Sequence, residues 1–449
     1  MSEHVDVAVL GMGPGGEVAA SRLLAAGKRV AVVERELIGG ECAYWACIPS
    51  KTVLRPPEAA GEVDRAAGVG GAQLDWPDTR EYRDYMARHL DDARQVAGYG
   101  KQGALVLKGE AGITAPGRIV VDGRELTADH LIVATGSDAR IPPIDGLDDV
   151  TTWTNRETYT ATELPGRAVI VGGSAAGVET AQFLTRFGVR VTLVQRGERL
   201  LGREEPRVGD LAATYLRTSG VDVRTGTIPT KAHREGAHSV LELDDGTSAH
   251  GDVIVLATGR TPRTAGLGLA AVGIELGERG EVLVDEHCRA ADGVWAIGDV
   301  TALLPFTHVA KYQGRIVADA ILGRPHPARY DGIPRVVFAD PEIAAVGLTQ
   351  TQADSQGLRT VTAEVDLAQA IARPWTYERA PRGHLGLLAD PSRRVLLGAW
   401  AVAPQAGEWI HQASLAIRAG IGIDVLLDQV AQFPTYTEGY LSALEALDL

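Results

Sequence analysis

Two cysteines, Cys42 and Cys47, stand five residues apart in a segment rich in glycine and aromatic residues. The chain has three cysteines in all, too few for a disulfide scaffold. A close pair of this kind is typical of redox chemistry or of metal binding. No second cysteine pair or histidine pair accompanies it, which argues against a metal site. We interpret the pair as a reactive dithiol/disulfide; the alternative is two buried, inert cysteines.

A glycine fingerprint precedes the cysteines. Gly11, Gly13 and Gly16 follow the apolar run 5–10 and open an alanine-rich helical pattern that ends near residue 26. In such a G-x-G-x-x-G turn the glycines allow a tight bend and close approach of a pyrophosphate to the helix N-terminus. Glu34 ends the next predicted strand, 23 residues after Gly11, where a carboxylate can accept from ribose hydroxyls. The pattern predicts a βαβ dinucleotide site.

The same plan recurs about 160 residues later. Gly172, Ser174 and Gly177 occupy the three fingerprint positions between a strand at 168–171 and a helix at 178–187. The position that corresponds to Glu34 is Gln195, followed by Arg196, with Arg199 close by. An acid there repels a 2′-phosphate, whereas arginine binds one. The second unit therefore predicts NADPH in preference to NADH; the alternative is that Arg196 is simply solvated.

Bulk composition narrows the class of protein. At 449 residues we expect two to four domains. The net charge of −14 argues against nucleic acid and anionic membranes as partners. The sequence contains no run of 18 apolar residues, so we expect no membrane-spanning helix. The first residues lack the basic pattern of a signal peptide, so we expect a cytoplasmic protein.

Further landmarks set the expected organisation. Strand-like runs end in Thr135-Gly136 and in Gly259, and a third ends in Gly298-Asp299. Strand patterns near 335–338 and 395–400, with helices near 408–419 and 437–447, predict a separate α+β domain. We expect an α/β protein with two Rossmann-like domains: a discontinuous domain at 1–150 and 266–333, a second at 151–265, and the α+β domain at 334–449.

The segment 39–51, Gly-Gly-Glu-Cys-Ala-Tyr-Trp-Ala-Cys-Ile-Pro-Ser-Lys, closely resembles the redox-active motif of the class I pyridine nucleotide-disulfide oxidoreductases. That family includes dihydrolipoamide dehydrogenase, glutathione reductase and mercuric reductase. The landmarks above follow in the family's order over nearly the whole chain. The resemblance implies FAD in the first nucleotide unit, NADPH in the second, and a C-terminal dimerisation domain that makes a homodimer.

The resemblance also implies roles for single residues. Cys47 is the flavin-side thiol and Cys42 the interchange thiol that meets the substrate. Lys51 is expected beside the flavin N5 atom with Glu179 as its partner. Asp299 is expected at the ribityl or pyrophosphate part of FAD, and His308 near the pyrimidine edge, with a packed core histidine as the alternative. The remaining expected cofactor residues are the fingerprint glycines with Ser174, Glu34, Gly40, Thr135, Gly136, Gln195, Arg196, Gly259 and Gly298.

The C-terminal motif departs from the family. Disulfide reductases carry a His-Pro pair and a Glu there, and the histidine is the acid–base of the interchange thiol. Here Phe433 stands in the histidine's place, while Pro434 and Glu438 are in register. A phenylalanine transfers no proton, and general acid–base help is worth about 10²–10⁴-fold in rate. Tyr436 remains as the polar aromatic expected to face Cys42 of the partner subunit; the alternative is a packed tyrosine.

Mercuric reductases also have an aromatic residue at this place, but they end in a cysteine pair that this chain lacks. A disulfide, from a small molecule or a protein, is therefore the expected substrate. The alternative is a quinone, because Tyr44, Trp45 and Trp409 could line a flat apolar pocket; core packing is the other interpretation of these aromatics. His411 is a candidate replacement base, and Cys288 is interpreted as structural. A non-catalytic, redox-sensing flavoprotein is a third class.

Overall fold

The computed structural model describes residues 3–449. The chain folds into two compact units. The first takes in the chain up to Ser50, Glu81–Arg140 and Gly259–Arg329; the second takes in Lys51–Arg80, Ile141–Thr258 and Tyr330–Leu449. The mixed α/β fold confirms the predicted fold class. The residue limits of the three predicted domains stay a prediction.

A largely parallel sheet forms the centre of the first unit, in the order β17-β18-β6-β1-β2-β3. Its middle strand, β1 (Glu3–Leu10), pairs in parallel with β2 (Val30–Glu34) and β6 (Arg124–Val133). Val7 and Val9 face one apolar core, while Ala8 and Leu10 face another. Burial on both faces explains why this strand is apolar throughout. The main path of the sheet also contains β3 (Leu105–Lys108), β17 (Arg289–Ala291) and β18 (Val294–Ala296), and β4 (Ala111–Ala115) and β5 (Arg118–Val121) extend the sheet from β6.

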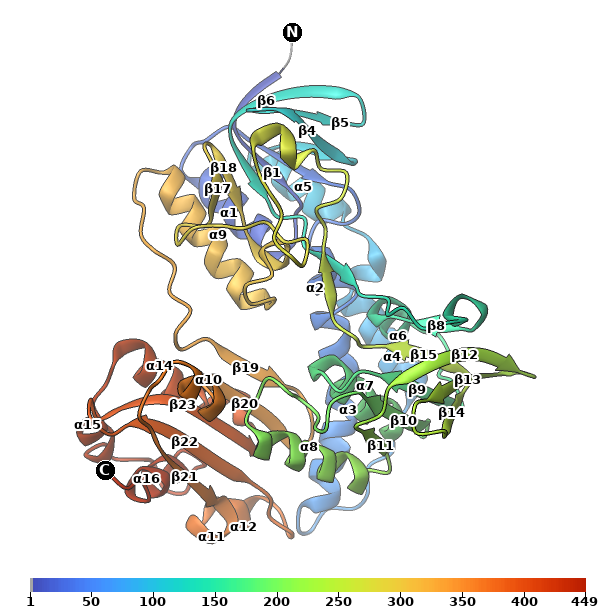
Figure 1. Cartoon of the computed structure of the whole chain (residues 1–449), viewed down its shortest axis with the longest axis vertical. Coiled ribbons are helices and arrows are strands. Elements are labelled where there is room, and N and C mark those ends of the chain that lie inside the picture. Colours follow the sequence, from blue (N-terminus) through green and yellow to red (C-terminus); the bar gives the residue numbers. More distant parts are fainter. Residues whose placement is uncertain (1–2) are drawn as a thin grey trace. The chain divides into compact units, whose positions relative to one another are not determined.

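Two helices cover one face of this sheet and lie side by side (Figure 1). They are α1 (Pro14–Ala25), which follows β1 directly, and α9 (Thr307–Ile321). Their alanine and glycine residues let them approach closely: a Cβ on Gly314 would lie 2.6 Å from the carbonyl oxygen of Gly15. The other elements are α2 (Gly40–Tyr44), η1 (Arg88–Leu90), α5 (Ala93–Lys101), η3 (Leu269–Val272), η4 (Gly298–Thr301) and the ribbon of β7 (Ser137–Ala139) with β16 (Arg260–Pro262).

The second unit contains another parallel sheet, in the order β11-β10-β9-β15-β8. Its strands are β8 (Thr152–Trp153), β9 (Arg167–Val171), β10 (Arg190–Gln195), β11 (Asp222–Thr225) and β15 (Val253–Leu256). The helices α6 (Asn155–Thr160), α7 (Ala175–Arg186) and α8 (Pro206–Thr218) and the turn η2 (Leu147–Asp149) accompany it. An antiparallel sheet of β12 (Pro229–Glu235), β13 (His238–Leu243) and β14 (Ser248–Gly251) lies against it. The second βαβ unit is thus present as predicted.

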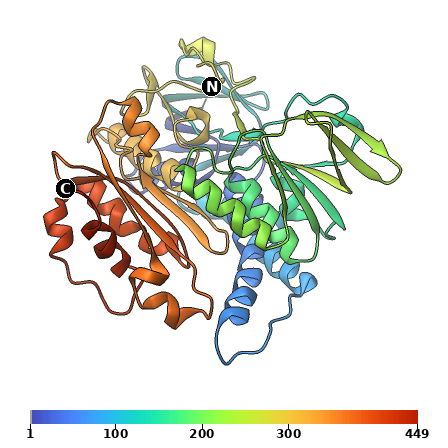
Figure 2. The ribbon, with the colours of Figure 1, turned by 60° about the horizontal axis from the view of Figure 1, so that its bottom comes forward.

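The C-terminal part of the second unit is an antiparallel sheet, in the order β19-β20-β23-β22-β21. Alternate residues of β20 face opposite ways: Ile343 and Ala345 pack toward the nucleotide-binding part, Ala344 and Val346 toward the C-terminal helices. Those helices lie on one face of the sheet (Figures 1 and 2). The strands are β19 (Pro334–Val337), β20 (Glu342–Gly347), β21 (Val361–Asp366), β22 (His384–Asp390) and β23 (Val395–Ala403). The helices of this part are α10 (Gln350–Ser355), α11 (Leu367–Ala370), α12 (Arg373–Tyr377), α13 (Ala406–Trp409), α14 (His411–Ala419), α15 (Ile423–Leu427) and α16 (Glu438–Glu445).

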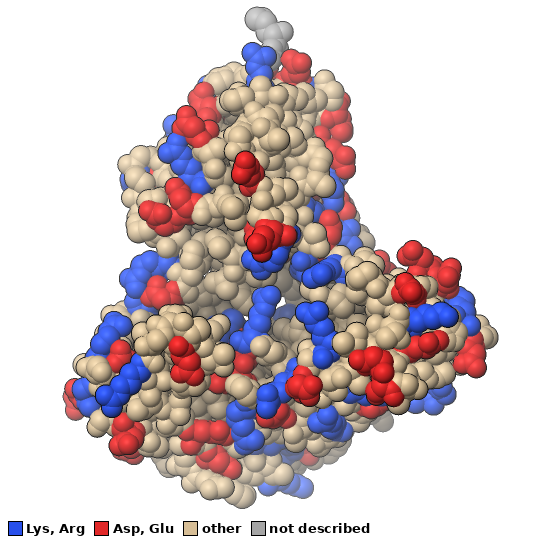
Figure 3. Space-filling model, viewed as in Figure 1, with Lys and Arg blue, Asp and Glu red and all other residues tan. Residues whose placement is uncertain are grey.

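Two helices run across the limits between the units: α3 (Cys47–Arg65) and α4 (Trp76–Met86). Acidic and basic side chains are mixed over the face shown in Figure 3, so no uniform basic surface covers that face. Within residues 3–449, no helix is both long and apolar enough to cross a membrane.

Candidate active site

The two cysteines of the redox motif lie together. Cys42 is in α2 and Cys47 is the first residue of α3, and both are half-buried thiols. A hydrogen bond between Cys42 and Cys47, together with burial, raises the pKa of Cys42. Thr307 is a further neighbour, with its Oγ1 3.2 Å from the Sγ of Cys47. The two thiols and the Thr307 hydroxyl thus form one hydrogen-bonded group, in which the pair's contact disfavours ionisation of Cys42.

Glu41, directly before Cys42, is held by arginines from the β16 segment. Its carboxylate lies 3.2 Å from Arg263 and 3.8 Å from Arg260. Arg263 is half-buried and also pairs with Asp138 at 2.6 Å. Because the acid is neutralised from two sides, the negative charge next to Cys42 is compensated within the same unit.

The first fingerprint loop joins β1 to α1 and has the geometry of a phosphate cradle. Gly11 has φ +98°, and a Cβ there would lie 2.4 Å from the carbonyl oxygen of Ala134. A Cβ on Gly16 would lie 2.1 Å from the carbonyl oxygen of Gly11. A Cβ on Gly13 would meet nothing within 4 Å, and Gly40 packs on this residue. The open backbone at Gly13, at the start of a helix, fits a pyrophosphate group.

Glu34 braces this loop from the end of β2. Its carboxylate accepts hydrogen bonds from the backbone N–H of Met12 and of Glu36, both at 2.8 Å. The side chain is almost fully buried. Contact with the ribose of FAD stays a prediction for this residue.

The predicted strand-end residues meet at the same edge of the first unit. The carboxylate of Asp299 accepts from the hydroxyl of Ser137 at 2.6 Å, and Gly298 donates its N–H to Gln313 at 2.6 Å. Thr135 donates its hydroxyl to the backbone of Arg263. Gly136, Gly259 and Gly298 have φ values of +74°, +111° and +77°, a region that favours glycine. These residues fit a bound dinucleotide, and their contacts with it stay predictions.

His308 is exposed at the start of α9 and stacks on Phe306, with ring centroids 5.3 Å apart. The alternative of a packed core histidine is therefore wrong. Cys288, in contrast, is fully buried, as the structural interpretation expected.

Tyr44 does not line a pocket. The ring is fully buried, its hydroxyl donates to the carbonyl of Ile38 at 3.0 Å, and Arg88 donates to it at 3.1 Å. Trp45, its half-buried neighbour, has its ring centroid 5.7 Å away. The core-packing interpretation is the correct one for Tyr44, because its polar end already has internal partners.

In the second unit, Lys51 and Glu179 form the expected pair. The Nζ of Lys51 lies 2.7 Å from the carboxylate of Glu179, whose other oxygen accepts from the N–H of Phe338 at 2.9 Å. The ring of Phe338 lies below the ammonium group, 4.8 Å from Nζ to the centroid. Glu179 is buried on α7, while Lys51 is about one third exposed. The side of Lys51 that stays open can still meet a ligand.

The second fingerprint repeats the geometry of the first. Gly172 has φ +112°, and a Cβ on Gly177 would lie 1.9 Å from the carbonyl oxygen of Gly172. Ser174 takes the middle position and donates its hydroxyl to the carbonyl of Ala257 at 3.1 Å. The loop fits a second dinucleotide at the start of α7.

Gln195 occupies the same place in this unit as Glu34 in the first. Its Oε1 accepts from the backbone N–H of Gly173 at 2.9 Å, just as Glu34 accepts from Met12. Arg196 follows and is exposed, whereas Arg199 is paired with Asp210 at 3.1 Å. The edge of this site is therefore a neutral amide followed by a cation.

The C-terminal motif places Phe433 at the surface, with about two thirds of its area exposed. Glu438 is the first residue of α16, and its carboxylate accepts from the N–H of Thr435 at 2.9 Å. The glutamate thus fixes its own loop. A catalytic role for Glu438 stays a prediction.

Tyr436 is packed inside the C-terminal part. Its ring is parallel to that of Trp409, 6.2 Å away, and perpendicular to that of Tyr377. Burial, with Glu378 and Tyr377 nearby, raises the pKa of its hydroxyl. This burial favours the packed-tyrosine interpretation. Contact between Tyr436 and the partner subunit's Cys42 stays a prediction.

The other two C-terminal candidates differ from each other. Trp409 is buried and donates its indole N–H to the carbonyl of Pro404, so it is a core residue. His411 is exposed at the first position of α14. A role for His411 as a base stays a prediction.

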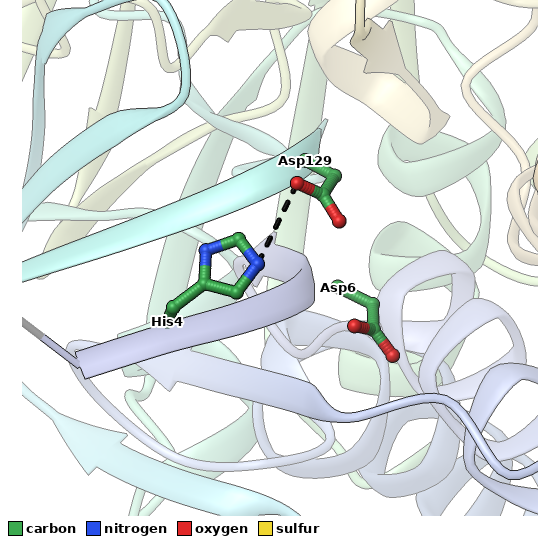
Figure 4. A group of neighbouring side chains, drawn as sticks. All are labelled: His4, Asp6 and Asp129. Atoms are coloured by element: carbon green, nitrogen blue, oxygen red, sulfur yellow. Dashed lines mark ion pairs between the residues drawn. The ribbon is translucent and has the colours of Figure 1, made fainter.

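Three side chains able to bind a metal, His4, Asp6 and Asp129, gather on β1 and β6 (Figure 4). His4 pairs with Asp129 at 3.5 Å. The carboxylate of Asp6 already accepts three hydrogen bonds from Arg29, which lower its pKa. An arginine-bound carboxylate is a poor cation ligand, so this group carries no metal argument.

Sequence reasoning missed two features of the dithiol site. Thr307 was one of them, although it directly precedes the candidate His308 in the chain. The pair Glu41–Arg263 was also missed, because its members are 222 residues apart and belong to different motifs.

Comparisons with known proteins agree with this geometry. Residues 5–314 match the family described as pyridine nucleotide-disulphide oxidoreductase, and residues 333–444 match that family's dimerisation domain. This chain belongs to the pyridine nucleotide-disulphide oxidoreductases. It is therefore a flavoprotein oxidoreductase that uses FAD and a pyridine nucleotide.

Individual relatives match nearly the whole chain. A mercuric reductase from Streptomyces lividans is 34% identical, over 99% of this chain and 95% of its own length. A dihydrolipoyl dehydrogenase from Thermus scotoductus is 34% identical, over 98% and 97%. Among solved structures, the Cu(II) complex of the HOCl-induced flavoprotein disulfide reductase RclA from Escherichia coli superposes with a TM-score of 0.88 at 27% identity, over 99% of both chains.

Proposed function

We propose that this oxidoreductase uses NADPH to reduce a small-molecule or protein disulfide through Cys42 and Cys47. The observation that carries the proposal is the hydrogen bond between the thiols of Cys42 and Cys47, which places the two sulfurs within reach of each other. In the family, the bound flavin accepts hydride and supplies two electrons to the cysteine pair.

The chain's own residues account for the thiol chemistry. Cys42 passes its proton to Cys47 or to water and attacks one sulfur of the substrate disulfide. The substrate S–S bond breaks, and the leaving sulfur takes up a proton from Cys47 or from water to become a thiol. Cys47 then attacks Cys42 in the mixed disulfide, releases the second thiol, and closes the Cys42–Cys47 disulfide. One substrate disulfide gains two electrons and two protons per cycle.

The test is a Cys42→Ser variant assayed with disulfides, quinones and metal ions as acceptors. We expect disulfide turnover to be lost while reduction of the flavin by NADPH is kept. The matched control is Cys288→Ala, a fully buried cysteine remote from the motif in sequence, which should keep turnover. Full disulfide turnover in Cys42→Ser would refute the proposal.

The quinone alternative loses its sequence argument. Two of the three aromatic residues on which it rested, Tyr44 and Trp409, are core residues with internal hydrogen-bond partners. We propose the disulfide as the acceptor for this reason.

We infer a preference for NADPH from Gln195 and Arg196. The amide carries no negative charge to repel a 2′-phosphate, and the exposed arginine supplies a bidentate donor. We expect Arg196→Gln to lower kcat/KM for NADPH by about tenfold or more, the effect of ~1.5 kcal/mol or more, and to leave the value for NADH nearly unchanged. Arg199→Gln is the control, because Arg199 is already paired with Asp210. A clear preference of the unaltered protein for NADH would overturn the inference.

We propose a homodimer in a cytoplasmic setting as the working form. The match of residues 333–444 to a dimerisation domain supports the dimer. Analytical ultracentrifugation at increasing dilution measures the molecular mass in solution. A monomer at the protein concentrations of the activity assay would contradict the proposed dimer.

A further inference from the structure

The hydroxyl of Thr307 lies against the dithiol. Its Oγ1 is 3.2 Å from the Sγ of Cys47, within hydrogen-bond range for sulfur. Thr307 is also a hydrogen-bond partner of Cys42, for which it lowers the pKa against the larger effects of Cys47 and burial. One hydroxyl on α9 thus contacts both sulfurs, although α9 is 260 residues away from Cys47 in sequence.

A second feature favours charge at the same sulfur. Cys47 is the first residue of α3, a helix of 19 residues, so its side chain is at the positive end of the helix dipole. The charged or titratable neighbours that act on the pair are Cys42 on α2 and Lys311 on α9, and the lysine favours an anion.

A hydroxyl donor distinguishes the two forms of a cysteine. Toward a thiol it makes a weak neutral contact, whereas toward a thiolate it makes a charge-assisted hydrogen bond, roughly twice as strong. Burial of the pair would otherwise penalise the thiolate. The donor matters more in this chain because Phe433 stands where relatives carry a histidine.

We propose that Thr307 is a catalytic residue that holds the negative charge of the dithiol on Cys47 by donating its hydroxyl to the thiolate. The inference rests on the proposed function and goes beyond it, because it assigns the electrostatic help to a residue of the same subunit.

The experiment uses the FAD-loaded protein with Cys42→Ser, in which the remaining thiol cannot form the disulfide. The Cys47 thiolate can then be titrated with pH by its long-wavelength charge-transfer absorbance with oxidised flavin. Its rate of alkylation by iodoacetamide gives a second titration that needs no flavin. We compare Thr307→Val, which keeps the shape and removes the donor, with Thr307→Ser, which keeps the donor.

We expect Thr307→Val to move both titration midpoints upward by about one to two pH units, because the thiolate, a charged group, loses one hydrogen bond. Thr307→Ser should keep the midpoints of the parent. Unchanged midpoints in Thr307→Val, or an equal shift in Thr307→Ser, would overturn the inference. Equal flavin content and melting temperature in the two variants exclude a folding defect.

The two hypotheses fail separately. If the Cys42→Ser protein keeps full disulfide turnover, the proposed function fails, while the Cys47 titration still reports on Thr307. If Cys42→Ser is inactive and the midpoints do not move, only the role of Thr307 fails.

Discussion

Glu179 binds both the ammonium group of Lys51 and the backbone N–H of Phe338, which precedes β20. Because Glu179 is buried, its replacement should lower the stability of the protein. In Glu179→Gln the amide oxygen can still accept from Phe338, but the ammonium of Lys51 loses its counter-charge. A broken buried pair costs ~3–5 kcal/mol. Because Lys51 is about one third exposed and keeps its contact with the ring of Phe338, we expect about 1–2 kcal/mol. Glu179→Ala also leaves the N–H of Phe338 without its acceptor, which adds ~1–3 kcal/mol.

The assay is thermal unfolding of the FAD-loaded protein, followed by circular dichroism and by flavin fluorescence. Because the chain has two units, we compare melting temperatures rather than a single free energy of unfolding. A loss of 1 kcal/mol corresponds to about 1–3 °C for a chain of this size. The order should be unaltered protein, then Glu179→Gln, then Glu179→Ala.

The matched control is Glu163→Gln, which removes an exposed glutamate that lies 3.8 Å from Arg80. A surface pair of this kind is worth less than ~1 kcal/mol, so the melting temperature should hardly change. If the melting temperature of Glu179→Gln equals that of the unaltered protein, or is no lower than that of Glu163→Gln, the reasoning from burial is wrong.

Three further outcomes can be measured. Burial, with Glu58 and Glu408 nearby, raises the pKa of Glu342 from 4.5 to about 7. Between these two pH values the folded state keeps a proton that the unfolded state has lost, so the protein loses stability as the pH rises through this range. Glu342→Gln should therefore stabilise the protein by about 2–3 kcal/mol at pH 8 and have no effect at pH 4, and equal stabilisation at both pH values would contradict the shift. Arg263→Met should slow alkylation of Cys42 about fivefold, roughly 1 kcal/mol, with recovery in the double variant that also carries Glu41→Gln; no recovery would count against a charge effect. Asp340→Asn, within a buried cluster of three arginines, should cost ~3–5 kcal/mol by urea unfolding, and a loss under ~1 kcal/mol would show that the cluster tolerates the missing charge.

The sequence was sufficient to predict those site residues whose function depends on spacing within one local motif. Both glycine fingerprints, the cysteine pair and the acid or amide at the second strand depend on offsets within a βαβ unit, and all are found in the expected elements. The contact between Lys51 and Glu179 came from resemblance, since nothing local relates residues 128 positions apart.

The burial of single side chains and the contacts between distant segments depend on tertiary packing, which the spacing of residues in the sequence does not predict. Tyr44 and Trp409 have a residue type that suits a core as well as an aromatic pocket, and only their burial and hydrogen bonds distinguish the two. Thr307 and Arg263 come to the dithiol from distant segments because the sheet order brings those segments together. No period or offset in the chain could indicate these contacts.

Glu34 and Gln195 show how a duplicated fold can keep one loop contact while the charge of the contacting side chain changes. Each side chain accepts from one backbone N–H of its fingerprint loop, at 2.8 Å and 2.9 Å. The second terminal atom differs: in Glu34 it is an oxygen that also accepts from Glu36, whereas in Gln195 it is an NH₂ group. A one-group exchange at this position therefore keeps the contact with the fingerprint loop while it changes the charge beside it. Under the NADPH proposal, Gln195→Glu is the shortest change by which engineering could redirect cofactor choice in the second half of the duplication alone.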